Sequence, residues 1–387
     1  MKMKSKILSF LLLVGATQAA EPLVYEGEEG IGKGKHIVFL ANDHEYRSEQ
    51  TCPLMDKILA KHHGFRCTVL FGLNEEGEIK PGAKSVPGLE DLESADMLFF
   101  FARFMNLPDA QVEHLASYFE KGGPALGLRT STHCFNGQEG QWSKFNYNYK
   151  GEDYFGGVGK QIFGLTWGKK GGQGHYGANH AQGSRMIAVE NSASHPILTG
   201  VSQIHAYSGA YSSPVPAGAT SLLNVQVLRT FEPSDKIAEN KPLEVSAWCR
   251  DSYTAPSGEK KDARNFYASF GAGEDMVDEN TRRLFANATL WAMGMEESIT
   301  PTLKVDIVGE FYPTPYYNGS YYYKGVKPAD LAAWDSAIMP QDAEVAGLNI
   351  SGKDSEKKKK KVARVLKNRP KMAERLMPKA AEPAEAH

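Results

Sequence analysis

The feature that most constrains this chain is a repeated alternation of short apolar runs with amphipathic segments. Residues 35–41 form an apolar run rich in branched and aromatic side chains, and a polar loop, a segment with helical spacing and a second apolar run at 65–71 follow. A strand, a helix and a strand in this order form a right-handed crossover unit of a parallel sheet. Residues 96–102 and 124–128 repeat the pattern around a helical segment that starts at Pro108. The alternation therefore predicts an α/β fold with a doubly wound, mostly parallel sheet.

The same pattern sets the expected domain boundaries. Two later runs, 245–248 and 264–270, and a helix that ends at Gly294 complete a domain over residues 35–296. Residues 20–34 are expected to be a short lead segment. Residues 297–350 are rich in tyrosine and are expected to form an extension on the surface of the domain.

The two ends of the chain have compositions of their own. Residues 1–19 combine three lysines, an apolar run and small residues, which is typical of a signal peptide cleaved after Ala19 or Ala20. The run is shorter than the roughly 20 apolar residues that span a bilayer, and no later run is longer. The sequence thus predicts a periplasmic or secreted protein without a transmembrane segment in the mature chain. Residues 351–387 have the composition of a disordered tail.

The charge is distributed unevenly along the chain. The whole chain has a formal charge of -2, residues 1–19 carry +3, residues 353–379 carry +9 and residues 380–387 carry -2, which leaves -12 for residues 20–352. So acidic a body repels phosphate backbones, and nucleic acid is excluded as its expected partner. The basic tail is expected to contact an anionic surface, by an attraction that salt screens.

Polar side chains follow the predicted strands at the points where the strands end. Ligands of open parallel sheets bind outside these carboxyl ends. A single polar residue there is often only a helix cap or a solvated loop charge, but four ends together favour one shared site. The residues are Asp43, His44, Glu45 and Arg47 after the first run, Arg103 after the third, Arg129, Ser131 and His133 after the fourth, and Glu274 and Asp275 after 264–270.

A long glycine-rich segment, residues 136–183, has no sustained period. A loop of this length inside a domain is usually functional. Its His175 and His180 are placed to fold over the strand ends, although a loop histidine taken alone is more often only solvated.

Five segments together resemble the ThuA-like (trehalose utilisation) family. They are residues 42–49, 127–133, 174–177, 195–198 and 265–294, and the resemblance covers residues 35–296. It implies a fold like that of class I glutamine amidotransferases and flavodoxins, and a role in sugar or glycoside catabolism. Some members of the family look like metal-binding proteins.

The chain departs from these relatives at two positions. Arg129 stands where amidotransferases carry their nucleophilic cysteine, so amidotransferase chemistry is not expected, and Cys134 is interpreted as structural. Gly271-Ala272 stands where many ThuA-like proteins have Gly-His, which weakens a metal site that would use that histidine. The cofactor stays unknown, with a divalent metal as the open candidate. The four cysteines are expected to be mostly buried free thiols.

The favoured interpretation is a protein that binds a carbohydrate or an oxidised keto sugar. Arg129 and Arg103 would hold a carbonyl or carboxylate through paired donors. His133 or His44 would move protons, and Asp43 or Glu45 would orient or assist them. The other residues at the site, Arg47, Ser131, His175, Glu274 and Asp275, are expected to bind substrate. Isomerase, lyase or hydrolase chemistry fits this interpretation, and the alternative is a non-catalytic sugar-binding or assembly module.

Overall fold

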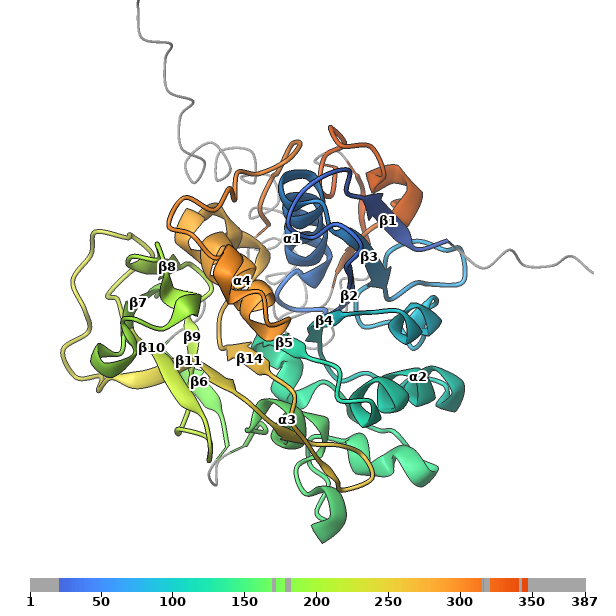
Figure 1. Cartoon of the computed structure of the whole chain (residues 1–387), viewed down its shortest axis with the longest axis horizontal. Coiled ribbons are helices and arrows are strands. Elements are labelled where there is room, and N and C mark those ends of the chain that lie inside the picture. Colours follow the sequence, from blue (N-terminus) through green and yellow to red (C-terminus); the bar gives the residue numbers. More distant parts are fainter. Residues whose placement is uncertain are drawn as a thin grey trace, which may run out of the picture.

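A ten-stranded sheet runs through the molecule, and one half of it contains the predicted parallel strands (Figure 1). A computed structural model describes residues 21–168, 172–177, 182–314, 316, 321–340 and 343–346. The strand order is β1-β3-β2-β4-β5-β14-β11-β10-β7-β8. The parallel strands are β2 (His36–Asn42), β3 (Arg66–Phe71), β4 (Met97–Ala102), β5 (Ala125–Leu128) and β14 (Asn265–Ala268). The α/β fold class is confirmed.

Both faces of the parallel strands are buried, which explains their continuous apolar sequences. In β2, Ile37 and Phe39 point into one core together with the apolar sides of α1 and α4, whereas Val38 and Leu40 point into a second core with α2 and α3. The helices are α1 (Ser48–His63), α2 (Asp109–Glu120), α3 (Gly157–Phe163) and α4 (Glu279–Ala292). The sheet is therefore covered on both sides, as a doubly wound fold requires.

The second half of the sheet is antiparallel and was mostly missed by the sequence interpretation. Its strands are β11 (Glu244–Arg250), β10 (Thr220–Val227), β7 (Ser184–Ala188) and β8 (Ile204–Ala206), while β1 (Leu23–Glu26) pairs antiparallel to β3 at the other edge. Buried and partly exposed residues alternate in β10, so it lacks the continuous apolar run that revealed the parallel strands. The remaining short strands form three two-stranded ribbons: β6 (Gly174–Tyr176) with β9 (Ala210–Ser212), β12 (Tyr253–Thr254) with β13 (Lys260–Lys261), and β15 (Tyr322–Tyr323) with β16 (Val345–Ala346).

The aromatic extension packs tightly against α1. Gln50 donates from Nε2 to the carbonyl of Tyr312 at 3.0 Å and accepts from the backbone N–H of Thr314 at 2.9 Å. Lys57 Nζ donates to the carbonyl of Ser336 at 2.7 Å. Four buried side chains of the extension belong to the same hydrophobic core as the apolar side of α1: Tyr321, Tyr323, Leu331 and Ile338. The extension thus adds to the core on this side of the sheet as well as covering it.

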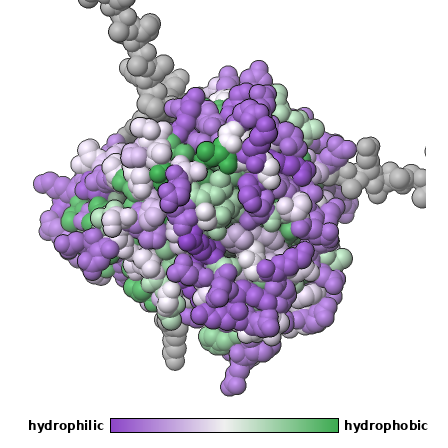
Figure 2. Space-filling view, viewed as in Figure 1, coloured by the Kyte–Doolittle hydropathy of each residue, from purple (hydrophilic) through white to green (hydrophobic). Residues whose placement is uncertain are grey.

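Some of the sequence predictions concern parts of the chain outside the described residues. They are the signal peptide, His180 and the basic tail. Within the described ranges, no helix has both the length and the apolar composition needed to cross a membrane. The face drawn in Figure 2 carries mainly hydrophilic residues, with hydrophobic ones gathered in small patches.

A substitution at Gly159 tests how closely α3 packs against the turn after β5. A Cβ atom at this position of α3 would lie 2.0 Å from the backbone oxygen of Thr132. We therefore expect Gly159→Ala to lower the free energy of unfolding by about 1–3 kcal/mol, although alanine is the better helix former. Gly174→Ala is the control, because no heavy atom lies within 4 Å of its added Cβ. Urea unfolding of both variants checks this, and an equally stable Gly159→Ala would contradict the packing.

Candidate functional site

Asp43 organises the loop that leaves β2. Its buried carboxylate accepts hydrogen bonds from the backbone N–H of Glu45 at 2.8 Å and of Tyr46, and from Thr130 Oγ1 at 2.5 Å. Its own N–H donates to Ser48 Oγ at 2.8 Å. Asp43 thus joins the loop after β2 to the turn after β5, and its expected catalytic role beside His44 or His133 stays a prediction.

Arg129 is fully buried in the turn after β5. It has a positive φ of 42°, and its Nη1 donates to Ser208 Oγ at 2.8 Å and to the carbonyl of Gly209 at 2.9 Å. The guanidinium carbon lies 3.7 Å from the centroid of the Tyr46 ring and 4.8 Å from that of Tyr211. In this structure the side chain positions Tyr46 and the loop at 208–209, and its assignment as a substrate ligand stays a prediction.

Three more of the predicted ligand-binding residues are buried and bonded to protein groups. Asp275 accepts from Ser208 Oγ at 2.5 Å and from the backbone N–H of Gly271 at 2.9 Å. Ser131 Oγ donates to the carbonyls of Phe100 and Leu128, both at 2.7 Å. Arg47 donates to the carbonyls of Tyr321 at 3.1 Å and His44 at 2.7 Å, and it pairs with Glu49 at 3.2 Å. These contacts hold the strand ends and the extension together.

His44, Glu45 and Arg103 form a connected group that solvent reaches. Arg103 Nη1 lies 2.6 Å from His44 Nε2, and its Nη2 lies 3.2 Å from Glu45 Oε1. The side chains of Arg103 and Glu45 are 18% and 10% exposed. Since a guanidinium only donates, His44 Nε2 accepts, and the ring proton of the neutral imidazole is on Nδ1.

Burial shifts the titration of this group in two directions. Desolvation lowers the pKa of His44 to about 4, and Arg103 adds to the effect while Asp43 opposes it. Desolvation also raises the pKa of Glu45 to about 7, although Arg103 acts in the opposite direction. Glu45 therefore exchanges its proton near neutral pH, whereas His44 stays neutral there.

Aromatic side chains surround His133, another of the predicted site residues. The ring of His133 lies 4.9 Å from that of Trp167, 5.3 Å from Phe104 and 6.2 Å from Tyr211. Desolvation and the nearby Arg103 hold its pKa well below the usual value, so it is neutral as well. His175 is exposed, and its ring lies 5.0 Å from the ring of Trp167.

Glu274 connects the strand ends to the extension. Its Oε1 accepts from the backbone N–H of Tyr316 at 3.2 Å, and the Tyr316 ring stacks on Tyr46 at 4.4 Å. Burial, followed by the neighbouring Asp275, raises the pKa of Glu274 to about 8. Glu274 lies in the layer beneath the solvent-accessible group.

The structure thus brings part of the predicted set together in one group, in which Arg103 is partly exposed and His175 is exposed while Glu45 and His133 are buried. We call this group the strand-end cluster and define it by His44, Glu45, Arg103, Phe104, His133, Trp167, His175 and Tyr211. The sequence interpretation missed Phe104, Trp167 and Tyr211. For Trp167 the available signal was the abundance of aromatic residues in the glycine-rich segment, whereas Phe104 and Tyr211 lie outside that segment.

The sequence left a divalent metal as the open candidate for a cofactor. Across the described residues, no group of three or more His, Cys, Asp or Glu side chains is arranged to hold a metal ion. All four cysteines are buried free thiols, and burial raises the pKa of Cys134.

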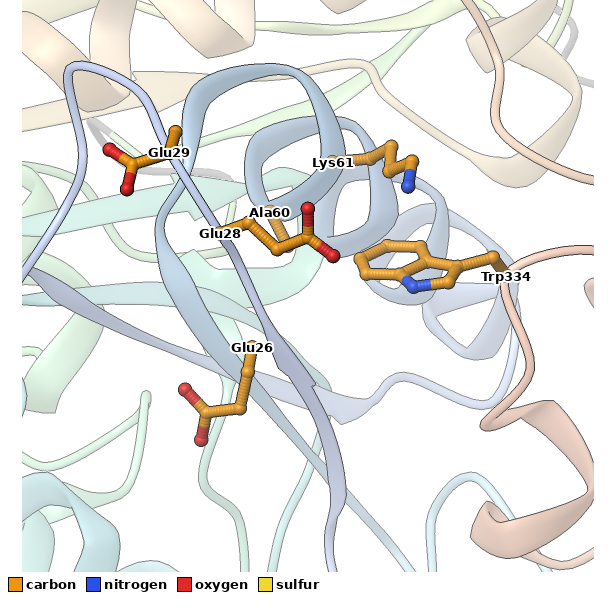
Figure 3. A pocket seen from close by; sticks show the side chains of 6 residues that line it. All are labelled: Glu26, Glu28, Glu29, Ala60, Lys61 and Trp334. Carbon is orange, nitrogen blue, oxygen red and sulfur yellow. The ribbon is translucent and has the colours of Figure 1, made fainter.

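A small pocket lies far from the strand-end cluster. It has a volume of about 130 Å³ and is lined by Glu26, Glu28, Glu29, Lys61 and Trp334 (Figure 3). Glu26 and Glu29 pair with basic side chains at 3.0 and 2.6 Å, and the amine of Lys61 lies 5.0 Å from the centroid of the Trp334 ring. Because α1 starts beside the cluster and the pocket lies near its last turn, about 20 Å of helix separates the two.

Comparisons with known proteins gave matches only among solved structures. No family model and no curated protein matches the chain. A protein described as ThuA-like from Bacteroides uniformis ATCC 8492 has 15% identity and a TM-score of 0.42, over 72% of this chain and 100% of that one. Another, from Parabacteroides merdae ATCC 43184, has 13% identity and a TM-score of 0.39, over 75% and 98%. An exo-β-1,4-mannosidase from Opitutaceae bacterium strain TAV5 has 9% identity and a TM-score of 0.30, over 70% and 37%.

Two of these structures carry the family name that the sequence motifs suggested. At such low identities and TM-scores, the similarities do not by themselves decide the family.

Glu274 gives a pH-dependent test of the buried layer. An unfolded glutamate ionises above about pH 4.5, whereas folded Glu274 keeps its proton up to about 8, so its stabilising contribution is present at low pH and is lost as the pH rises between these values. Glu274→Gln cannot ionise and keeps the oxygen that accepts from Tyr316. We expect its unfolding free energy, relative to the native chain, to rise by more than about 1 kcal/mol between about pH 5 and 8.

The control for this test is Glu113→Gln on the exposed side of α2. Chemical unfolding at several pH values measures all three proteins. Parallel stability curves for Glu274→Gln and the native chain would show that Glu274 is ionised in the fold.

Proposed function

We propose that the strand-end cluster binds a carbohydrate or an oxidised keto sugar and transfers a proton on it. The observation that carries the proposal is the partly exposed pair of Glu45 and Arg103, with a Glu45 pKa of about 7, beside the aromatic rings around His133. The motif resemblance to ThuA-like proteins, which implies sugar or glycoside catabolism, supports the same substrate class.

The cluster has side chains that can contact both the apolar C–H face of a sugar and its polar oxygen atoms. Trp167 and Phe104 are partly exposed rings that can pack against the C–H face of a pyranose. Arg103 and Glu45 supply donors and an acceptor for hydroxyl or carbonyl oxygens. Exposed His175 lies beside Trp167 and adds a polar group at the rim.

The pair of Glu45 and Arg103 also fits proton abstraction next to a carbonyl. As a carboxylate, Glu45 would take the proton from the carbon beside a keto group. The guanidinium of Arg103 would stabilise the enolate oxygen that forms. When the carbon that loses its proton carries a hydroxyl group, the hydroxyl proton moves to the enolate oxygen and Glu45 returns its proton to the former carbonyl carbon, which isomerises the keto sugar. In a lyase reaction the enolate instead re-forms the carbonyl and expels an alkoxide from the β-carbon, and the alkoxide takes the proton from Glu45.

His44 and His133 are placed to support this chemistry as neutral groups. Because Arg103 donates to His44 Nε2, the imidazole orients the guanidinium. Nδ1 is buried and has no hydrogen-bond partner in the described part of the chain. In this proposal Glu45, whose pKa lies closest to neutral, is the base.

A non-catalytic sugar-binding or assembly module remains the second candidate function. It is favoured by the number of predicted site residues, among them Asp43, Arg129 and Asp275, whose polar atoms are already bonded to protein groups. Export through the predicted signal peptide, and a periplasmic or secreted location, belong to the proposal in either case.

Glu45→Gln tests the proposed base. With methyl keto-glucosides as substrates, the native chain should gain activity as the pH rises through about 7, because Glu45 must lose its proton. Glu45→Gln should lower turnover by about 10²–10⁴-fold and remove this pH dependence, while the control Glu90→Gln on the surface should behave like the native chain. Binding without turnover by the native chain would favour the non-catalytic module.

Arg103→Lys tests whether ligand binding needs the paired donors of a guanidinium or only a positive charge. A lysine keeps the charge but cannot contact Glu45, His44 and a ligand oxygen in one plane. We expect at least about tenfold weaker binding of a keto-glucoside to Arg103→Lys and a further loss in Arg103→Ala, at nearly unchanged melting temperature. Calorimetric titration and thermal unfolding measure the two effects. If affinity is unchanged in both variants, Arg103 does not bind ligand.

A further inference from the structure

A second cavity lies behind the ribbon of β6 and β9. It has a volume of about 470 Å³, within the range of about 300–1,000 Å³ that is typical of small-molecule sites. The residues that matter for its chemistry are Ser212, Ser213, Val215, Asn224, Leu243 and Glu244. We call it the ribbon pocket.

The ribbon separates this pocket from the strand-end cluster. Tyr211 pairs with His175 in the ribbon, and its ring contacts those of Trp167 and His175 in the cluster. Ser212, the next residue of β9, lines the ribbon pocket, as expected from the alternation of side chains along a strand. The two places are thus separate sites on opposite sides of one ribbon.

The wall of the ribbon pocket is held by a buried hydrogen-bonded link. Gln173 Nε2 donates to Ser213 Oγ at 2.8 Å, and its Oε1 accepts from Thr132 Oγ1 at 2.6 Å and from Tyr267 Oη at 3.1 Å. On the other side, Glu244 Oε2 accepts from the backbone N–H of Ser213 at 3.0 Å. The carboxylate is therefore held in place before any ligand arrives.

The lining side chains exclude several classes of ligand. The charged side chain among the described lining residues is the carboxylate of Glu244, which repels an anion. None of these described lining residues is aromatic, so a quaternary ammonium ion would lack the ring faces that usually bind it. A wholly apolar ligand would cover the Asn224 amide and the remaining acceptor positions of Glu244 without forming hydrogen bonds to them, at a cost of about 1–3 kcal/mol for each group left unsatisfied.

Apolar side chains at the pocket are exposed to an unusual degree. Val215 and Leu243 are 57% and 54% exposed, and they are two of the five large apolar side chains that are exposed in the described part of the chain. Their meeting in one pocket, beside hydroxyl, amide and carboxylate groups, indicates a ligand that has both an apolar face and hydroxyl groups.

We propose that the ribbon pocket is an accessory binding site for a neutral sugar ring. Leu243 and Val215 contact the C–H face of the ring. The Asn224 amide donates to and accepts from its hydroxyl groups, and the Glu244 carboxylate accepts from them. The site does not require the strand-end cluster to be catalytic.

Ligand-observed saturation-transfer NMR and titration on the full chain test this site. The probes are the methyl glycosides of glucose, galactose and mannose, with tetramethylammonium as the cationic comparison. We expect at least one glycoside to bind, and Leu243→Ser and Asn224→Ala each to weaken it by about tenfold or more. The control Ile31→Ser removes another exposed apolar side chain, 42% exposed, elsewhere on the surface and should leave binding unchanged.

Arg103→Ala separates this proposal from the proposed function. If the glycoside signal survives Arg103→Ala, and if Leu243→Ser or Asn224→Ala added to Arg103→Ala then removes it, the ribbon pocket binds the sugar. If it is lost only in Arg103→Ala, the sugar binds at the strand-end cluster and the accessory site is wrong while the proposed function stands. Binding of none of the three glycosides, or of tetramethylammonium alone, would also overturn the accessory site.

Discussion

The buried guanidinium of Arg129 is the interaction on which the strand ends depend. A buried cation is costly unless its donors are satisfied, and here Ser208 and Gly209 accept from it while Tyr46 stacks on its face. Ser208 in turn donates to Asp275. One charge therefore fixes the turn after β5, the loop after β2, the loop at 208–209 and the turn that precedes α4. Each of these carries residues of the strand-end cluster or lies directly beneath it.

The layer above Arg129 has a different electrostatic character because it is only partly buried. Glu45 and Arg103 pair at 3.2 Å, and their side chains are 10% and 18% exposed. Burial raises the pKa of Glu45 to a value near neutrality, whereas it keeps His44 and His133 neutral. A base that exchanges its proton near pH 7, next to a fixed cation, is the arrangement that proton transfer beside a carbonyl needs. The proposed chemistry comes from this difference in burial between neighbouring residues.

The accuracy of the sequence interpretation differed between the two halves of the sheet. The parallel strands were located to within about two residues, because burial on both faces leaves a continuous apolar run such as that of β4. The antiparallel strands were mostly missed, since β10 mixes polar and apolar residues and short strands such as β8 carry little signal. The extension was expected on the surface, yet Tyr321 and Tyr323 are buried against α1. Their burial depends on partners such as Arg47, which lies more than 270 residues earlier in the chain.

The sequence by itself determined the α/β class and the gathering of polar residues at the strand ends. Periodicity and strand order are local properties, and parallel topology brings the carboxyl ends together whatever the side chains are. Only the tertiary structure decided which of those residues are buried and bonded to protein groups and which are reached by solvent. Asp43, Arg129 and Glu45 look alike as polar residues after a strand. Their difference lies in burial and hydrogen-bond partners that come from distant segments, because a charge taken out of water must be satisfied by whichever groups the fold places beside it.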